Sequence, residues 1–246
     1  MEFCRTRKAR VALAVTAAVL ILVGGVCGVY LGDYYRADTE AVVAFAADRP
    51  VTRRVADDGT VVIAPPNPEV GLIFYPGGKV EHTAYEPLLT ACAEQGILCV
   101  LTEMPFRLAV LDINAADGIR EQYPAITRWY IGGHSLGGSM AAAYVEKHTD
   151  AFEGLVLLGS YSTADLSQSG LKVLSIYGSE DTVLNREKYA ECLPYLPADR
   201  TEHVIAGGCH AYFGMYGPQD GDGTPTIDRV EQLEQTAAHV GAFIRS

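Results

Sequence analysis

The chain has 246 residues, of which 49% are hydrophobic and 20% charged. This length is enough for one substantial domain with a buried core and leaves little room for a second. The formal net charge of −11 argues against electrostatic binding of nucleic acid or of an anionic membrane surface. We interpret the acidity as a contribution to solubility.

The N-terminus combines a basic cluster with a long apolar run. Basic residues crowd positions 1–10, where Glu2 is the only acidic residue, and no charged residue occurs in positions 11–32. As a helix this run would be about 33 Å long, which is enough to cross a bilayer. Because Lys and Arg mark the cytoplasmic side, we predict a cytoplasmic N-terminus at 1–10, a transmembrane signal-anchor at 11–32 and an extracytoplasmic remainder.

A cleaved signal peptide and secretion are the alternative for this segment. No Ala-x-Ala cleavage site is present, and Val26 is bulky for the position before a lipoprotein cysteine at Cys27. A buried core helix is a third interpretation, although a charge-free stretch of this length behind a basic N-terminus is uncommon in soluble domains.

After the anchor, a polar spacer at 33–50 with a helical pattern around Glu40–Ala47 leads into a domain at 51–246. The domain begins with a predicted hairpin of Thr52–Ala56 and Thr60–Ala64 around an Asp-Asp-Gly turn. Short apolar runs then alternate with longer amphipathic stretches. This alternation predicts an α/β fold, a mostly parallel sheet covered by helices.

The elements of this α/β region are predicted from the apolar periodicity. The strands are Gly71–Tyr75, Ile97–Leu101, Trp129–Gly132, Leu155–Leu158, Val173–Tyr177 and His203–Ile205. The helices are Ala84–Glu94, Ala109–Tyr123, Gly138–His148, Arg186–Leu193 and Asp228–Ile244.

The candidate nucleophile is Ser135, at the centre of Gly133-His134-Ser135-Leu136-Gly137. A bare Gly-x-Ser-x-Gly is weak evidence, but here it directly follows a predicted strand and precedes a predicted helix. A nucleophile elbow requires this position, with small residues where backbone segments approach closely. The alternative is a glycine-rich turn without catalysis.

A serine nucleophile needs a base, and the base needs an acid that orients it. In α/β-hydrolases the chain order is Ser, then Asp or Glu, then His. The predicted acid is Asp181, in a loop after a strand, with Glu180 as the alternative. The predicted base is His210, in a glycine-rich loop after the last strand, whereas His203 lies in a strand and His239 in the last helix.

Two backbone N–H groups are predicted to stabilise a developing oxyanion. The first is that of Leu136, because it opens the helix after the serine, where the positive end of the helix dipole lies. The second comes from the Pro-Gly-Gly-Lys loop after an earlier strand, where we favour Gly78 and take Lys79 as the next possibility. A plain Pro-Gly-Gly turn is the alternative.

From about residue 70 to residue 244, these motifs resemble the α/β-hydrolase superfamily. More narrowly, they resemble a small bacterial group, related to the dienelactone hydrolases, that shares Phe-Tyr-Pro-Gly-Gly-Lys-Val, Gly-His-Ser-Leu-Gly-Gly and a Gly-Gly-x-His-Ala loop. The resemblance implies the α/β-hydrolase fold and ester hydrolysis, without fixing a substrate. Cys209 departs from the polar residue expected in this group before the histidine.

Many relatives insert a helical lid between the strands that end at Leu158 and begin at Val173, but the connection here is too short for a large one. We therefore expect an open site for small or exposed esters. Its predicted pocket residues are Lys79, Phe106, Tyr161 and Tyr212.

The four cysteines of the domain are Cys92, Cys99, Cys192 and Cys209. An even number outside the membrane permits disulfides, with a Cys209–Cys192 bond as one way to tether the histidine loop. Buried free thiols are the alternative, and the sequence does not decide between them.

The expected function is that of a serine hydrolase, carboxylesterase-like, which cleaves small-molecule carboxylic esters by acyl transfer through Ser135. We expect no metal or organic cofactor, because neither His-Glu-x-x-His nor paired Cys-x-x-Cys spacing occurs. The expected partners are the ester substrate and, through the N-terminal helix, a membrane. The alternatives are a peptidase or thioesterase on the same fold and a catalytically silent, membrane-tethered binding module.

Overall fold

The chain divides into two units, one ending at Tyr34 and the other beginning at Tyr35. The computed structural model describes the backbone of residues 2–246. The side chains of residues 2–11, 14 and 26 lie outside the described part. The predicted basic cluster at 1–10 therefore falls on side chains that are not described.

The first unit is a single helix, α1 (Glu2–Gly32). Most of its described apolar side chains are exposed, for example Leu20, Ile21 and Leu22. From Val15 to Gly32 the helix is long and apolar enough to cross a membrane, and a signal sequence has the same features.

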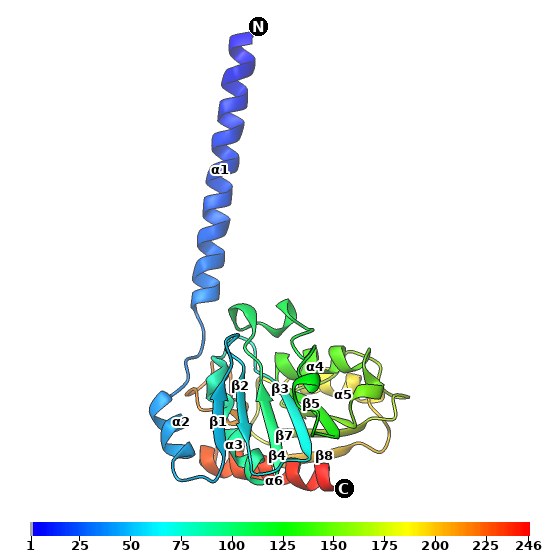
Figure 1. Cartoon of the computed structure of the whole chain (residues 1–246). Coiled ribbons are helices and arrows are strands. Elements are labelled where there is room, and N and C mark those ends of the chain that lie inside the picture. The colour runs from blue at the N-terminus through cyan, green and yellow to red at the C-terminus, as the bar shows by residue number, and fades with distance from the viewer. Residues whose placement is uncertain (1) are drawn as a thin grey trace. The chain divides into compact units, whose positions relative to one another are not determined.

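The second unit contains an eight-stranded sheet in the order β1-β2-β4-β3-β5-β6-β7-β8 (Figure 1). The strands are β1 (Thr52–Val55), β2 (Val61–Ala64), β3 (Val70–Tyr75), β4 (Ile97–Leu101), β5 (Arg128–His134), β6 (Gly154–Leu158), β7 (Lys172–Gly178) and β8 (Thr201–Ile205). Strand β2 pairs antiparallel with β1 and β4, and all other pairs are parallel. The predicted mostly parallel sheet is confirmed.

Helices cover both faces of this sheet. They are α2 (Thr39–Ala46), α3 (Glu86–Glu94), α4 (Leu136–Val145), α5 (Arg186–Cys192) and α6 (Arg229–Arg245). Alternate strand residues point to opposite faces, so Phe74 packs with α2, α3 and α6 in one core while Ile73 packs with α4 in the other. Helices α3 and α6 contact each other along the first face.

The parallel arrangement brings the carboxyl ends of the central strands to one edge. Tyr75 at the end of β3 pairs with Gly133 in β5, and His134 at the end of β5 pairs with Leu158 at the end of β6. The loops that follow these strands therefore meet at this edge, where ligands bind in open α/β sheets.

Two segments differ from the sequence expectation. The predicted helix Ala109–Tyr123 is wrong: this stretch holds only the short 3₁₀ turns η3 (Ala109–Leu111) and η4 (Arg120–Gln122). Gly118 at φ +73 and side chains such as Asn114, which favour turns, interrupt the helix. In addition, α2 contributes Val42 and Phe45 to the core, so most of the predicted spacer 33–50 belongs to the folded unit.

Candidate active site

Ser135 lies in a sharp turn between the end of β5 and the start of α4. Its backbone has φ 52° and ψ −123°, a strained conformation for a residue with a side chain. Two hydrogen bonds hold the turn in place: Ser135 N–H donates to the Leu158 carbonyl at 2.9 Å, and Ser160 Oγ donates to the Ser135 carbonyl at 2.7 Å. The serine is thus presented at the carboxyl edge of the sheet, as the elbow prediction requires.

The two outer glycines of the motif are needed for steric reasons. A Cβ at Gly137 would lie 2.2 Å from the Tyr75 carbonyl oxygen, and one at Gly133 would lie 2.6 Å from the same atom. No side chain fits at either distance. The end of β3 can therefore cross the serine turn at close range, which brings the Pro76–Lys79 loop beside Ser135.

His210 and Asp181 form a buried pair. His210 Nδ1 lies 2.8 Å from Asp181 Oδ2, and the two side chains are 1% and 0% exposed. Asp181 Oδ1 accepts hydrogen bonds from the backbone N–H groups of Val183 and Leu184, at 3.0 and 2.8 Å. These three bonds compensate the buried carboxylate and fix its orientation toward the imidazole.

The alternative acid and bases lie in different surroundings. Glu180 accepts a hydrogen bond from the Ser179 hydroxyl at 2.8 Å in an exposed position. His203 and His239 stack on each other with ring centroids 3.9 Å apart. None of these three side chains lines the cavity at Ser135.

That cavity has a volume of about 260 Å³ and contains both Ser135 and His210. Its other lining residues are Leu136, Ser139, Gly159, Ser160, Tyr161, Val183, Leu184 and Asn185. His210 Nε2 is buried and has no hydrogen-bond partner among the described residues. The geometry thus leaves one imidazole nitrogen free in a pocket that also holds the elbow serine.

Of the four predicted pocket residues, only Tyr161 lines this cavity. Phe106 is 59% exposed and lines a separate surface cavity, and its backbone has φ 51°. Tyr212 lines a third cavity, where the Arg229 guanidinium lies 4.6 Å from its ring centroid. The expectation that Phe106 and Tyr212 form pocket walls is not met.

The N–H groups of the Gly77–Lys79 loop have different acceptors. Gly77 N–H donates to the Tyr85 hydroxyl at 3.1 Å, and Lys79 N–H donates to the Arg107 carbonyl at 2.8 Å. Among the described residues Gly78 N–H has no such acceptor. Gly78 also packs against the Leu136 side chain, since a Cβ placed on it would lie 2.9 Å from Leu136 Cδ2. The Lys79 N–H is therefore occupied by the Arg107 carbonyl, whereas the Gly78 N–H is available to a ligand.

A buried tyrosine connects this loop to the serine turn. The Tyr85 hydroxyl accepts from Gly77 N–H and lies 2.7 Å from His134 Nδ1. His134 in turn lies against His210, with ring centroids 4.4 Å apart. Burial, and secondarily the neighbouring His210, lower the pKa of His134 well below its ordinary value. His134 is therefore neutral, and its Nδ1 shares a hydrogen bond with the Tyr85 hydroxyl.

Three further residues support the His210 loop and were not found from the sequence. Asp222 accepts hydrogen bonds from the N–H groups of His210 and Ala211, at 3.1 and 2.8 Å. The Gln232 amide accepts from Cys209 N–H at 3.0 Å and donates to the Cys209 carbonyl at 2.8 Å. Gly159 lies against the acid–histidine pair, where a Cβ would be 3.0 Å from His210 Nδ1.

The four domain cysteines are free, buried thiols in the structure, so the suggested Cys209–Cys192 bond is not formed. Burial, followed by the neighbouring Asp222, raises the pKa of Cys209 to about 12. In the described part of the chain, no group of three or more His, Cys, Asp and Glu side chains could hold a metal ion.

Comparison with known proteins supports a relationship at the level of family and fold. The model of the "Alpha/beta hydrolase family" matches residues 71–234, which is more than half of the chain. No curated protein sequence matches the chain.

Several solved structures have the same fold. TT1662 from Thermus thermophilus is 17% identical with a TM-score of 0.57, covering 79% of this chain and 97% of that one. A predicted CIB-like hydrolase from Thermoplasma acidophilum is 15% identical with a TM-score of 0.56, covering 79% and 98%. The esterase domain of a Rhodothermus marinus protein is 13% identical with a TM-score of 0.58, covering 79% and 97%. The family match, the sheet order and the strand-to-helix serine turn lead to one assignment: the chain belongs to the alpha/beta hydrolase family.

Proposed function

We propose that this hydrolase is a serine esterase in which Ser135 is the nucleophile, His210 the general base and Asp181 the residue that orients the base. The observation that carries the proposal is the buried His210–Asp181 pair, whose free Nε2 shares a cavity with the strained elbow serine. Buried polar atoms are nearly always satisfied, so an unpartnered imidazole nitrogen beside a nucleophile favours a functional role.

The tautomer of His210 follows from its neighbour. An ionised carboxylate can only accept hydrogen bonds, so the imidazole proton lies on Nδ1 and points to Asp181. Nε2 then carries the lone pair and is the acceptor for the Ser135 hydroxyl proton. A catalytic serine–histidine bond is often long in a free enzyme and shortens when substrate binds.

In the proposed reaction, Ser135 Oγ forms a bond to the ester carbonyl carbon as its proton passes to His210 Nε2. The negative charge moves to the carbonyl oxygen, which accepts from the N–H groups of Leu136 and Gly78. The alcohol leaves with the proton from His210, and the acyl group remains on Ser135. Water then attacks this acyl-enzyme, again deprotonated by His210, which releases the acid and restores Ser135.

The cavity supports small acyl groups as substrates. Its volume is about 260 Å³, and residues 159–171, where a lid would be inserted, form turns without a helix. Its walls combine the apolar Leu136 and Val183 with the polar Asn185. We expect acetyl and butyryl esters to be cleaved better than long-chain esters.

We further propose that α1 anchors the hydrolase domain to a membrane, with the domain on the extracytoplasmic side. The charge-free run and the basic positions before it support this orientation. Resistance of the chain to extraction at alkaline pH would distinguish an anchored protein from a secreted one.

Steady-state hydrolysis of p-nitrophenyl acetate tests the proposed reaction. Ser135→Ala is expected to reduce kcat/KM by about 10⁴-fold or more, because the nucleophile is lost. Ser167→Ala, in the loop after β6, is the matched control and is expected to retain activity. Faster turnover of peptides or thioesters than of acetyl and butyryl esters would replace the esterase proposal with one of those activities.

A further inference from the structure

An apolar surface is exposed on the segment that contains η2 (Pro105–Arg107) and η3 (Ala109–Leu111). Phe106, Val110 and Leu111 are 59%, 51% and 55% exposed, and we call these three side chains the apolar patch. Exposure of single apolar residues is ordinary, but here three fall within six positions of one segment. No described contact of the domain explains why this cluster faces solvent.

Buried residues fix the segment that carries the patch. Met104, two positions before Phe106, and Ala109, directly before Val110, are buried in the core next to α4. Turn hydrogen bonds from Leu108 N–H to the Pro105 carbonyl and from Leu111 N–H to the Leu108 carbonyl, both 3.0 Å, fix the backbone. The structure therefore presents the apolar patch in a defined conformation and does not leave it to a loose loop.

The backbone at the patch is also strained. Phe106 and Arg107 have φ values of 51° and 61°, a region that side chains disfavour. Such strain persists where surrounding contacts maintain it, and it is concentrated at functional positions. Phe106, one of the two strained residues, is the aromatic side chain of the patch and is largely exposed.

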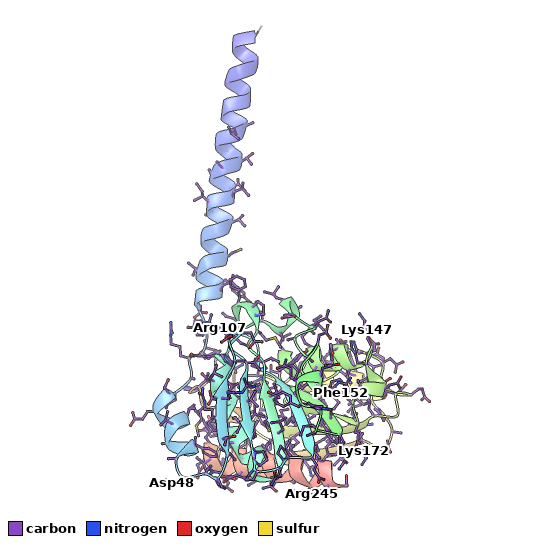
Figure 2. The ribbon with its side chains drawn as sticks, viewed as in Figure 1. Asp48, Arg107, Lys147, Phe152, Lys172 and Arg245 are labelled. Carbon is purple, nitrogen blue, oxygen red and sulfur yellow. The ribbon has the colours of Figure 1, made fainter. Side chains whose placement is uncertain are left out.

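The patch is connected to the chain segment that leaves α1. Tyr35 N–H donates to the Lys79 carbonyl at 2.8 Å, Lys79 N–H donates to the Arg107 carbonyl at 2.8 Å, and Arg107 adjoins Phe106 in the sequence. Figure 2 labels Arg107, at the edge of the domain opposite Arg245. Only Asp33 and Tyr34 separate Gly32, the last residue of α1, from Tyr35.

This short connection limits how far the domain can lie from a membrane that holds α1. Three Cα steps from Gly32 to Tyr35 span at most about 11 Å. Since Tyr35 is held by the loop that binds Arg107, the patch lies close to the point where the chain enters the domain.

We propose that the apolar patch inserts into the surface of the bilayer in which α1 is anchored, so that the hydrolase domain sits on the membrane at a fixed face. The inference rests on the proposed anchor. Side chains such as phenylalanine and leucine partition into the region between headgroups and acyl chains. Glu103 and Asp112 line the same surface cavity as Phe106, so attraction to anionic lipids does not drive the contact.

Tryptophan fluorescence of the full chain in phosphatidylcholine vesicles tests this proposal. Leu111→Trp and Val110→Trp place a reporter in the patch. Val204→Trp, at a 50% exposed position on β8, is the matched control. The chain has one tryptophan, Trp129, which is buried, so the unsubstituted chain supplies the background emission. Vesicles are compared with and without phosphatidylcholine that carries a nitroxide near the top of its acyl chain.

For both patch reporters, tryptophan emission is expected to shift to the blue on vesicles and to be quenched roughly twofold by the nitroxide lipid. The emission of Val204→Trp is expected not to be quenched. Equal quenching at all three positions, or none in chains that float with the vesicles, would overturn the patch contact and leave the anchor intact. A blue shift without quenching would assign the patch to a second copy of the chain instead. Failure to float would remove the anchor and the patch contact together, while ester hydrolysis, measured in the same samples, tests the esterase proposal separately.

Discussion

The two halves of the candidate site hold their groups by different contacts. The loops of Asp181 and His210 are held largely by side chains: Asp181 accepts two backbone N–H bonds, and Asp222 and Gln232 bind the backbone around His210. The Gly78 loop is held largely by backbone bonds, from Lys79 to Arg107 and from Tyr35 to Lys79.

This difference determines where single substitutions can act. A side-chain contact is removed by one substitution, and the buried backbone N–H or carbonyl that loses its partner is costly. A backbone contact survives most substitutions of the residue that makes it. We therefore expect the acid–histidine half to be sensitive at many positions and the Gly78 half to be sensitive mainly at Tyr85, whose hydroxyl binds its backbone.

The largest loss of kcat is expected from Asp181→Asn, in the acid–histidine half of the site. The amide oxygen is expected to stay on the N–H groups of Val183 and Leu184, which turns the NH2 donor toward His210 Nδ1. The imidazole then has to accept at Nδ1 and adopts the wrong tautomer, so kcat falls by about 10⁴-fold. Glu180→Gln is the matched control, expected to change kcat less than about threefold, since Glu180 contacts Ser179 and not the histidine. The opposite ranking in p-nitrophenyl acetate turnover would move the acid by one position.

On the Gly78 side, Tyr85→Phe is expected to reduce kcat by roughly tenfold with little change in KM. The Tyr85 hydroxyl binds Gly77 N–H and so positions the neighbouring Gly78 N–H, the proposed oxyanion donor. Displacing such a donor reduces kcat less than removing it does. Tyr144→Phe removes a hydroxyl bonded to Asp117 at 2.8 Å and serves as the control. If both variants lose stability alike and neither loses kcat, Tyr85 has no positioning role.

The smallest effect concerns His134, whose folded-state pKa lies well below its ordinary value because of burial and the nearby His210. Below about pH 6.5 the unfolded chain binds a proton that the folded chain does not, so folding stability falls as pH decreases. His134→Gln is expected to remove up to about 1.4 kcal/mol per pH unit of this dependence. Urea unfolding between pH 5 and pH 7, with His148→Gln as control, measures it; equal slopes in the two variants would contradict the assignment.

The fold was predictable because its signals are local. Short apolar strands and amphipathic helices each carry their own periodicity, and the parallel topology follows from their alternation. The predicted helix Ala109–Tyr123 was wrong because its apolar spacing resembles that of a helix, while the backbone forms turns. Gly118 has positive φ, as do Phe106 and Arg107 just before this stretch. Propensity alone does not register such backbone constraints.

Only the residues of the candidate site that belong to the Ser, Asp, His order of the family motif could be predicted from the sequence. Ser135, Asp181 and His210 stand in the sequence in the order that the family motif requires, and their catalytic roles remain a prediction. Tyr85, Asp222 and Gln232 carry no motif, since they act on backbone groups 8 to 23 positions away. Phe106 was wrong as a pocket wall for a related reason: no motif marks its strained backbone at φ 51° or the exposure of its side chain.

Labelling with a fluorophosphonate, followed by mass spectrometry of the peptides, tests the central claim most directly. Such a probe phosphonylates an activated serine and leaves ordinary serines unmodified. Modification is expected at Ser135 in the full chain and in Ser167→Ala, none in Ser135→Ala, and a much slower reaction in Asp181→Asn. Absence of label in the unsubstituted chain, or label that persists in Ser135→Ala, would contradict the account of Ser135 as the nucleophile.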